Sequence, residues 1–180
     1  MEIRERSFSS FFIFFVFLVF FIFFILQVLG PLTMPTGSID NLSGLTVLSD
    51  NEDEISKMPF PYNTIYSVGD RLCHQKEERS FFINGNQMPF CARCTAIWLG
   101  LSIGIFLMIF FEIKLSEKIF LMILIGLIPL GIDGVGQLIG LWESTNLIRF
   151  LTGILTGIVS GIALGVIIDE LKDIITQKSR

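Results

Sequence analysis

The chain has 180 residues, of which 52% are hydrophobic, with a mean hydropathy of +0.70 and a formal net charge of −4. The net charge is small and no basic stripe exists to neutralise phosphates, so we expect no nucleic-acid partner. Three cysteines are an odd number and too few for a disulfide-scaffold protein, whereas long uncharged blocks predict an integral membrane protein.

The first predicted element, residues 1–29, is a signal-anchor-like transmembrane helix. Its apolar core runs without interruption over residues 11–26, and Arg4 and Arg6 precede it. A cleaved signal peptide is the alternative, but this core exceeds the usual 7–15 residues and no A-x-A-like site follows it. We therefore expect the helix to be retained and to span the membrane.

A flexible, acidic connector is expected next, over residues 30–65, and it contains the acidic run NEDE at residues 51–54. A membrane domain is expected over residues 66–168, followed by a C-terminal tail over residues 169–180. Within that domain we expect a Cys/His loop over residues 66–94 and helices at about 91–111, 119–139 and 147–168. Each apolar block approaches the roughly 20 residues that a helix needs to cross hydrocarbon. The predicted fold class is an all-α integral membrane protein with four transmembrane helices and an extramembrane Cys/His loop before the second.

Positive residues beside the spans predict the orientation. They precede the first span, occupy the turn between the second and third, and follow the fourth: Arg4, Arg6, Lys114, Lys118, Lys172, Lys178 and Arg180. With four spans, all of them fall on one side of the membrane. We therefore expect a multi-pass protein of the cell membrane with cytoplasmic N- and C-termini and an extracytoplasmic Cys/His loop.

The third and fourth spans carry residues that are costly at membrane depth. Asp133 and Gln137 lie four residues apart, on one face of the third span. In the fourth span, Arg149 is followed at four-residue steps by Gly153, Gly157, Gly161 and Gly165. Such a ladder lets another helix approach closely, either within the chain or from a second copy in a homo-oligomer. A structural explanation for the charges is an ion pair between Asp133 and Arg149.

Chain direction brings the unusual polar residues to one end of the bundle. The second span starts at that end, the third rises toward it and the fourth descends from it. The candidate catalytic residues are Asp133, Arg149 and Arg93, and the candidate substrate-binding residues are Arg79, Gln137, Asn146 and Thr152. Because three of these residues are arginines, the expected substrate is a small anionic or lipid-linked molecule, held through a group such as a lipid phosphate.

The spacing Cys73-His74-x16-Cys91-x2-Cys94 predicts a metal site, with zinc as the favoured ion and these four residues as ligands. The adjacent Cys73 and His74 can both ligate only on a tight turn or at a helix start. If His74 swings away, three thiolates and a water would give an open site, with His74 free as a base. With Asp133 as acid or base, a hydrolase or transferase is one function that uses these parts.

Two other interpretations of the cysteines stay open. In the first, the protein is a membrane thiol–disulfide oxidoreductase in which Cys91 and Cys94 form a reactive pair at a helix N-terminus and Cys73 is the exchange partner. In the second, the protein is a non-catalytic membrane module whose structural metal or disulfide fastens the loop to the bundle.

The residues around the cysteines resemble an uncharacterised prokaryotic family of predicted membrane proteins, the domain of unknown function 2085. The first block of the resemblance comprises Cys73, His74, Gln75, Arg79, Ser80, Phe81, Gly85, Gln87, Pro89, Cys91, Arg93, Cys94 and Thr95. The second comprises Asp133, Gly134, Gln137, Glu143, Ser144, Asn146, Arg149, Thr152 and Gly153. Ala96 and Trp98 depart from the family's small-aromatic continuation. The resemblance covers about residues 66–165 and implies a membrane protein without implying a reaction.

Overall fold

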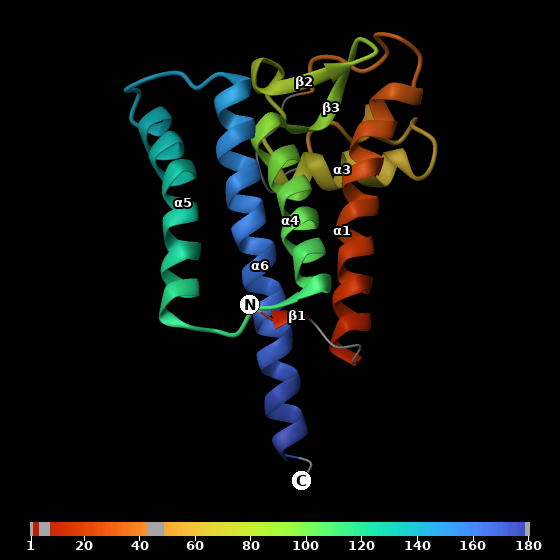
Figure 1. The fold of residues 1–180 in the computed structure, drawn as a ribbon. Coiled ribbons are helices and arrows are strands. Elements are labelled where there is room, and N and C mark those ends of the chain that lie inside the picture. The colour runs from red at the N-terminus through yellow and green to blue at the C-terminus, as the bar shows by residue number, and fades with distance from the viewer. Residues whose placement is uncertain (1, 4–7, 43–48, 179–180) are drawn as a thin grey trace.

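Four long helices make up most of the computed structural model, which describes residues 2–3, 8–42 and 49–178 (Figure 1). They are α1 (Phe8–Thr33), α4 (Ala92–Phe110), α5 (Glu117–Leu138) and α6 (Asn146–Lys178). Each is long and apolar enough to cross a membrane, which confirms the predicted four-span helical fold class. Arg4, Arg6 and Arg180, which contribute to the predicted orientation, lie outside the described residues.

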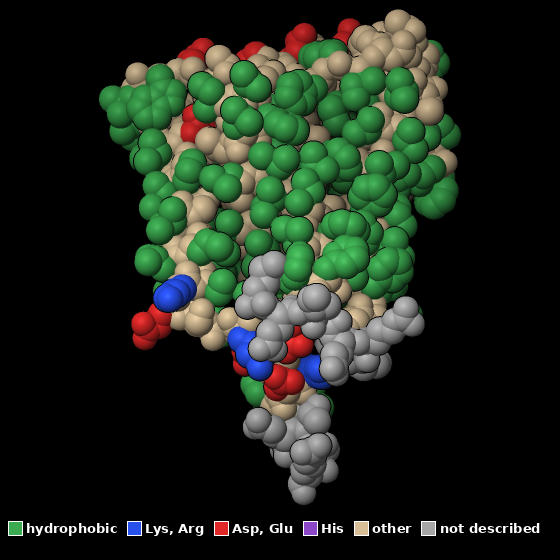
Figure 2. All heavy atoms as spheres, in the orientation of Figure 1, with side chains coloured by type: hydrophobic (Ala, Val, Ile, Leu, Met, Phe, Trp, Pro, Cys, Tyr) green, Lys and Arg blue, Asp and Glu red, His purple; other side chains and the backbone are tan. Residues whose placement is uncertain are grey.

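The helices stand side by side in the order α5, α6, α4, α1 (Figure 1). The short strand β1 (Glu2–Ile3) pairs with β4 (Phe111–Glu112), at the same end of the bundle as the turn between α4 and α5. Hydrophobic side chains cover most of the bundle on the face seen in Figure 2, and the Lys and Arg side chains visible on that face lie toward this end. This belt suits a surface in contact with lipid.

Glycines bring α4 and α6 together. A Cβ at Gly100 would lie 2.4 Å from the Ile154 carbonyl oxygen, and a Cβ at Gly157 would lie 2.7 Å from the Gly100 Cα. Gly104 and Gly161 make a second such crossing one turn further along. The predicted close approach at the ladder is therefore met within the chain. The ladder face is covered by α4, so it does not support the homo-oligomer contact expected there.

α5 packs less closely than the other helices and lies at the edge of the bundle (Figure 1). Many of its apolar side chains are exposed, including Phe120, Leu124, Ile128 and Ile132. It meets α6 where Gly126 lies against Val159. Exposed apolar side chains on a helix of this length are the pattern expected of a lipid-facing span.

A small cap, residues 62–91, closes one end of the bundle. It consists of α3 (Tyr62–Leu72), the 3₁₀ turn η1 (Glu77–Arg79), β2 (Ser80–Ile83) and β3 (Asn86–Cys91). The strands form an antiparallel hairpin whose turn residues, Asn84 and Gly85, both have positive φ, at 53° and 73°. An Asn-Gly pair is the preferred sequence for such a two-residue turn because both positions need left-handed backbone. The sequence-based prediction did not include this hairpin.

The connector expected over residues 30–65 is more closely attached than a solvated linker. α1 continues to Thr33 and a short helix, α2, spans Glu52–Ile55. Four of its apolar side chains are buried in one cluster with Tyr66 of the cap: Ile39, Leu42, Ile55 and Met58. These apolar residues are scattered among acidic ones and form no periodic pattern. Their burial still stabilises the folded state, because it removes apolar surface from water.

α6 also continues past the predicted end of the fourth span at residue 168, into the expected tail, and projects beyond the other helices (Figure 1). A helix does not need to stop where its apolar run stops, because polar residues such as Glu and Lys favour helix almost as strongly as leucine does. Glu170 in this extension accepts a hydrogen bond from the Leu115 backbone N–H at 3.3 Å. The extension therefore contacts the turn between α4 and α5.

Candidate metal centre

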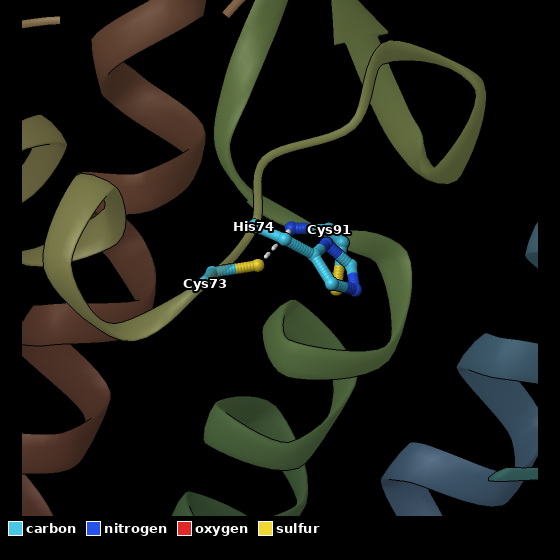
Figure 3. Close-up of side chains that lie close together, drawn as sticks. All are labelled: Cys73, His74 and Cys91. Carbon is cyan, nitrogen blue, oxygen red and sulfur yellow. Dashed lines mark hydrogen bonds between the residues drawn. The ribbon is translucent and has the colours of Figure 1, made fainter. Parts of the chain in front are cut away.

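The Cys/His cluster lies where the cap meets α4 (Figure 3). The sulfurs of Cys73 and Cys91 and a ring nitrogen of His74 all lie within 4.8 Å of one another. Cys94 is in the first turn of α4, and its thiol hydrogen-bonds to the sulfurs of Cys73 and Cys91. Three of the four predicted metal ligands, Cys73, His74 and Cys91, thus form one group that could hold a metal ion, and Cys73 and Cys91 are buried.

The backbone turns sharply at Cys73 because α3 ends there. Cys73 is extended, and Gln75 two residues later has a positive φ of 37°. The Gln75 side chain donates to the Pro89 carbonyl oxygen at 2.8 Å, which ties this turn to β3. A Cβ at Gly69 would lie 2.0 Å from the same oxygen, so α3 can meet β3 here only with glycine. This turn is what lets the adjacent Cys73 and His74 face one point.

Cys91 is both the last residue of β3 and the residue that caps the N-terminus of α4. Its backbone N–H donates to the Cys73 sulfur at 3.4 Å (Figure 3). Because α4 starts immediately afterwards, Cys94 stands one turn along the helix and on the side of Cys91. The C-x-x-C spacing therefore places its two sulfurs together as the sequence predicts.

Hydrogen bonding within the cluster makes Cys91 easier to ionise than Cys73. Hydrogen bonds from Cys73 and Cys94 hold the pKa of Cys91 well below its usual range. The hydrogen bond to Cys91 raises the pKa of Cys73 to about 11. Burial lowers the pKa of His74, so its imidazole is neutral at pH 7. The site thus offers one thiolate and a neutral imidazole, the forms in which these side chains bind metals.

His74 has one ring nitrogen that makes no hydrogen bond to the described residues. Its Nδ1 atom is buried and has no hydrogen-bond partner among the described residues. A buried polar atom left without a partner costs free energy, and ligation of an ion is one way to remove that cost. This orphaned nitrogen, the three sulfurs and their spacing fit a zinc-type ion, which is bound by thiolate and imidazole.

Asp133 pairs with Arg93 of α4 and not with Arg149, so the structural explanation expected from the sequence is wrong in its partner. The Asp133 carboxylate bonds to Arg93 Nη2, and it also accepts from Trp142 Nε1 at 3.5 Å and from the Ser144 hydroxyl. α4 and α5 are thereby joined at the cap end of the bundle. Arg149, in the first turn of α6, is instead linked to the cap, through Asn146 and the Ser80 carbonyl oxygen.

Arg149 is bound by an amide. Its Nη1 donates to Asn146 Oδ1 at 2.8 Å, and Asn146 Nδ2 donates in turn to the Ser80 carbonyl oxygen of β2 at 3.1 Å. Arg79, Arg93, Cys91 and Asp133 all lie within electrostatic range of Arg149. The predicted convergence of polar residues at one end is therefore present in the geometry.

The remaining candidate residues are less closely involved. Gln137 is half-buried and its Nε2 has no partner among the described residues. Thr152 donates to the Ile148 carbonyl oxygen of its own helix at 2.9 Å. Its hydroxyl is thus used within α6, whereas Arg79 stands beside His74 on the cap.

Sequence reasoning missed two partners of Asp133. Ser144 was present only as part of the resemblance, and Trp142 carried no signal at all. The Trp142 ring lies over Gly136, where a Cβ would come within 2.2 Å of it. The role of Gln87 was also missed. Its Oε1 accepts a hydrogen bond from the Leu42 backbone N–H, and its Nε2 donates to the carbonyl oxygens of Leu42 and Gln75. These bonds hold the turn before the hairpin in place.

Comparisons with known proteins identify a family that includes this part of the chain. The profile of the family described as predicted membrane protein (DUF2085) matches residues 73–164, which include every residue of the cluster. An uncharacterized protein of Methanocaldococcus jannaschii is 44% identical over 93 residues, which are 49% of this chain and 58% of that protein. An uncharacterized protein of Methanothermobacter thermautotrophicus is 40% identical over 83 residues, 46% of this chain and 75% of that protein. This chain thus spans little more than half the length of the first relative. No solved structure matches the chain.

Proposed function

The chain belongs to the family of predicted membrane proteins DUF2085, and we propose that it is a multi-pass membrane protein in which Cys73, His74, Cys91 and Cys94 hold a zinc ion. The observation that carries this proposal is the convergence of three ligand atoms within 4.8 Å, with the fourth sulfur beside them. Three thiolates and one imidazole complete a tetrahedral site, the arrangement found in structural zinc centres.

The role that best suits such a site is to fasten the cap to the bundle. Cys73 comes from the end of α3, Cys91 from the end of β3 and Cys94 from α4. An ion that joins these three elements would stabilise the contact between cap and membrane helices, because its binding free energy is added to that of folding.

A hydrolase or transferase that acts on an anionic or lipid-linked substrate needs more than this. It requires an open metal position and a group free to carry a proton. In the proposed site Cys94 supplies the fourth ligand, and Asp133 is engaged by Arg93, Trp142 and Ser144. We therefore assign Asp133 to positioning Arg93 and place no proton transfer on it.

We also propose that the cap faces the outside of the cell membrane and that both termini are cytoplasmic. The turn between α4 and α5 carries Lys114 and Lys118, and the extension of α6 carries Lys172, all at the end opposite the cap. Positive residues close to span ends favour the cytoplasmic side. The positive residues of the cap belong to a long loop, which has little weight in this rule.

The proposal is tested by metal content and thiol count on the full chain purified in detergent. We expect stoichiometric zinc, three thiols that resist alkylation, and exposure of those thiols after chelation. Cys73→Ser and Cys91→Ser should lose the metal because each removes a ligand that no other residue can replace. Lys76→Ala is a matched control, since Lys76 is an exposed neighbour of His74 on the same turn.

Protein that carries no metal and contains a reducible bond between Cys91 and Cys94 would instead support the thiol–disulfide oxidoreductase. Zinc that survives Cys73→Ser and Cys91→Ser unchanged would place the metal elsewhere in the chain.

A further inference from the structure

Arg149 is a buried charge that forms no direct ion pair among the described residues. The residue is only 5% exposed and lies at the start of a membrane span. Among the described residues no carboxylate forms an ion pair with it, and its Nε atom is buried without a hydrogen-bond partner. A buried charge of this kind is costly unless something else compensates it.

Two further arginines lie within electrostatic range of Arg149: Arg79 on η1 and Arg93 on α4. Each of them also has a buried Nε atom without a hydrogen-bond partner in the described chain. We call these three residues the arginine cluster. The three residues come from three different elements. They are therefore brought together by the tertiary fold and not by a local pattern in the sequence.

The charges around the arginine cluster do not cancel. Arg149 has two other guanidinium groups and one carboxylate, that of Asp133, within electrostatic range, and this carboxylate is already paired with Arg93. Glu78 approaches Arg79 at 3.8 Å, but its side chain is 68% exposed. Water screens such a pair, so it adds little compensation at the buried end of the cluster.

The hydrogen-bonding edges of Arg149 show what could compensate it. Nη1 is used by Asn146, which Ser80 holds in place. Nε has no partner, and Nη2 makes no hydrogen bond to the described residues, so one complete edge of the guanidinium is unused. That edge, with two parallel N–H groups, matches two oxygens of a phosphate or similar oxyanion.

We propose that Arg79, Arg93 and Arg149 form a binding site for a phosphate-type oxyanion, at the end of the bundle where the helices meet the cap. A lipid headgroup and free phosphate both carry this chemistry. The site uses residues other than the metal ligands, so it goes beyond the proposed zinc centre and does not depend on it. Asp133 then has the role of holding Arg93 in the cluster.

The test uses the full chain in detergent after exhaustive delipidation. Two quantities are measured: the phosphorus that stays with the protein, and the shift in thermal unfolding midpoint on titration with inorganic phosphate at constant ionic strength. Arg149→Gln is the main variant, because glutamine keeps a polar side chain and removes the charge. Arg71→Gln is the matched control, since Arg71 is an exposed arginine that precedes the same loop.

We expect one of two positive results in the unmodified protein. Stoichiometric phosphorus that survives delipidation identifies a lipid headgroup as the source, and stabilisation by inorganic phosphate without retained phosphorus identifies the free anion. In either case Arg149→Gln should weaken binding roughly tenfold or more, the effect of losing charged hydrogen bonds, and Arg71→Gln should not. If Arg149→Gln does not fold, Arg79→Gln on the cap provides the same comparison.

Zinc content of each variant separates this proposal from the previous one. Normal zinc with no retained phosphorus and no response to phosphate would overturn the anion site and leave the metal centre standing. Equal effects of Arg149→Gln and Arg71→Gln would also overturn it, because they would reduce the cluster to general surface charge. Loss of phosphate binding at normal zinc content is the result that supports it.

Discussion

Cys91 is the thiol of the cluster whose pKa is lowered, and this affects its neighbour Cys73. It takes the negative charge, so Cys73 keeps its proton until the pH approaches about 11. A cysteine thiol such as that of Cys94 is ordinarily protonated at pH 7, since its usual pKa is about 8.5. At pH 7 Cys73 and Cys94 therefore carry protons, and His74, whose pKa is lowered by burial, is neutral.

Zinc binding at pH 7 should therefore release about two protons, one each from Cys73 and Cys94. Protons compete with zinc for the ligands, so the affinity for zinc should rise about a hundredfold for each pH unit while two protons are released. This range of pH begins above the pKa of His74 and ends where the thiols lose their protons. Calorimetry in buffers of different ionisation enthalpy measures this number. Cys94→Ser should halve it to about one proton. A release of one proton in the unmodified protein would exclude Cys94 as a ligand.

At the scale of elements, the contact between α4 and α6 depends on the absence of side chains. Gly100 lies against the Ile154 carbonyl oxygen and the Gly157 Cα, both of which are backbone atoms that cannot rotate away. Gly131 on α5 has nothing within 4 Å of where its Cβ would be. Both glycines lie inside helices, where glycine is a poor helix former, but only Gly100 is in close contact with another helix.

Gly100→Ala should lower stability by about 1–3 kcal/mol, because the added methyl forces the two helices apart. Gly131→Ala is the matched control and should leave stability unchanged or slightly increased, since alanine is the better helix former. Reversible unfolding in mixed micelles measures both values. Similar losses in the two variants would mean that glycine acts here through the backbone alone.

For the whole molecule, the four spans place the cap and the turn between α4 and α5 at opposite ends of the bundle (Figure 1). Asp40 is exposed near the cap, and Leu115 is 59% exposed in that turn. The two positions therefore report on opposite sides of the membrane. They lie in described segments outside the spans, so a substitution at either should leave the bundle intact.

A membrane-impermeant maleimide should label Asp40→Cys in intact cells and should label Leu115→Cys only after permeabilisation. The physical reason is the positive charge of Lys114, Lys118 and Lys172, which favours retention of their end on the cytoplasmic side. The unmodified chain controls for its own three cysteines. The reverse labelling pattern would invert the orientation and leave the arrangement of the sites unchanged.

How much of the site was predictable depends on how its residues come together. The C-x-x-C pair is local, because a helix start fixes where residues three apart must lie, and so the cysteine cluster followed from spacing. The partner of Asp133 is not local. The sequence predicted Arg149 as the partner, and the packed structure pairs Asp133 with Arg93 instead.

The sequence by itself determined the four apolar spans, the glycine ladder and the gathering of the polar residues at one end. The spans follow from runs of apolar residues, the ladder from a four-residue repeat of glycine, and the gathering from the direction in which each span crosses the membrane. Only the tertiary structure decided that α4 covers the ladder, that scattered apolar residues of the connector pack under the cap, and that Asp133 pairs with Arg93 and not with Arg149. These depend on contacts between residues far apart in the chain, whose free energies arise only once the helices have packed together.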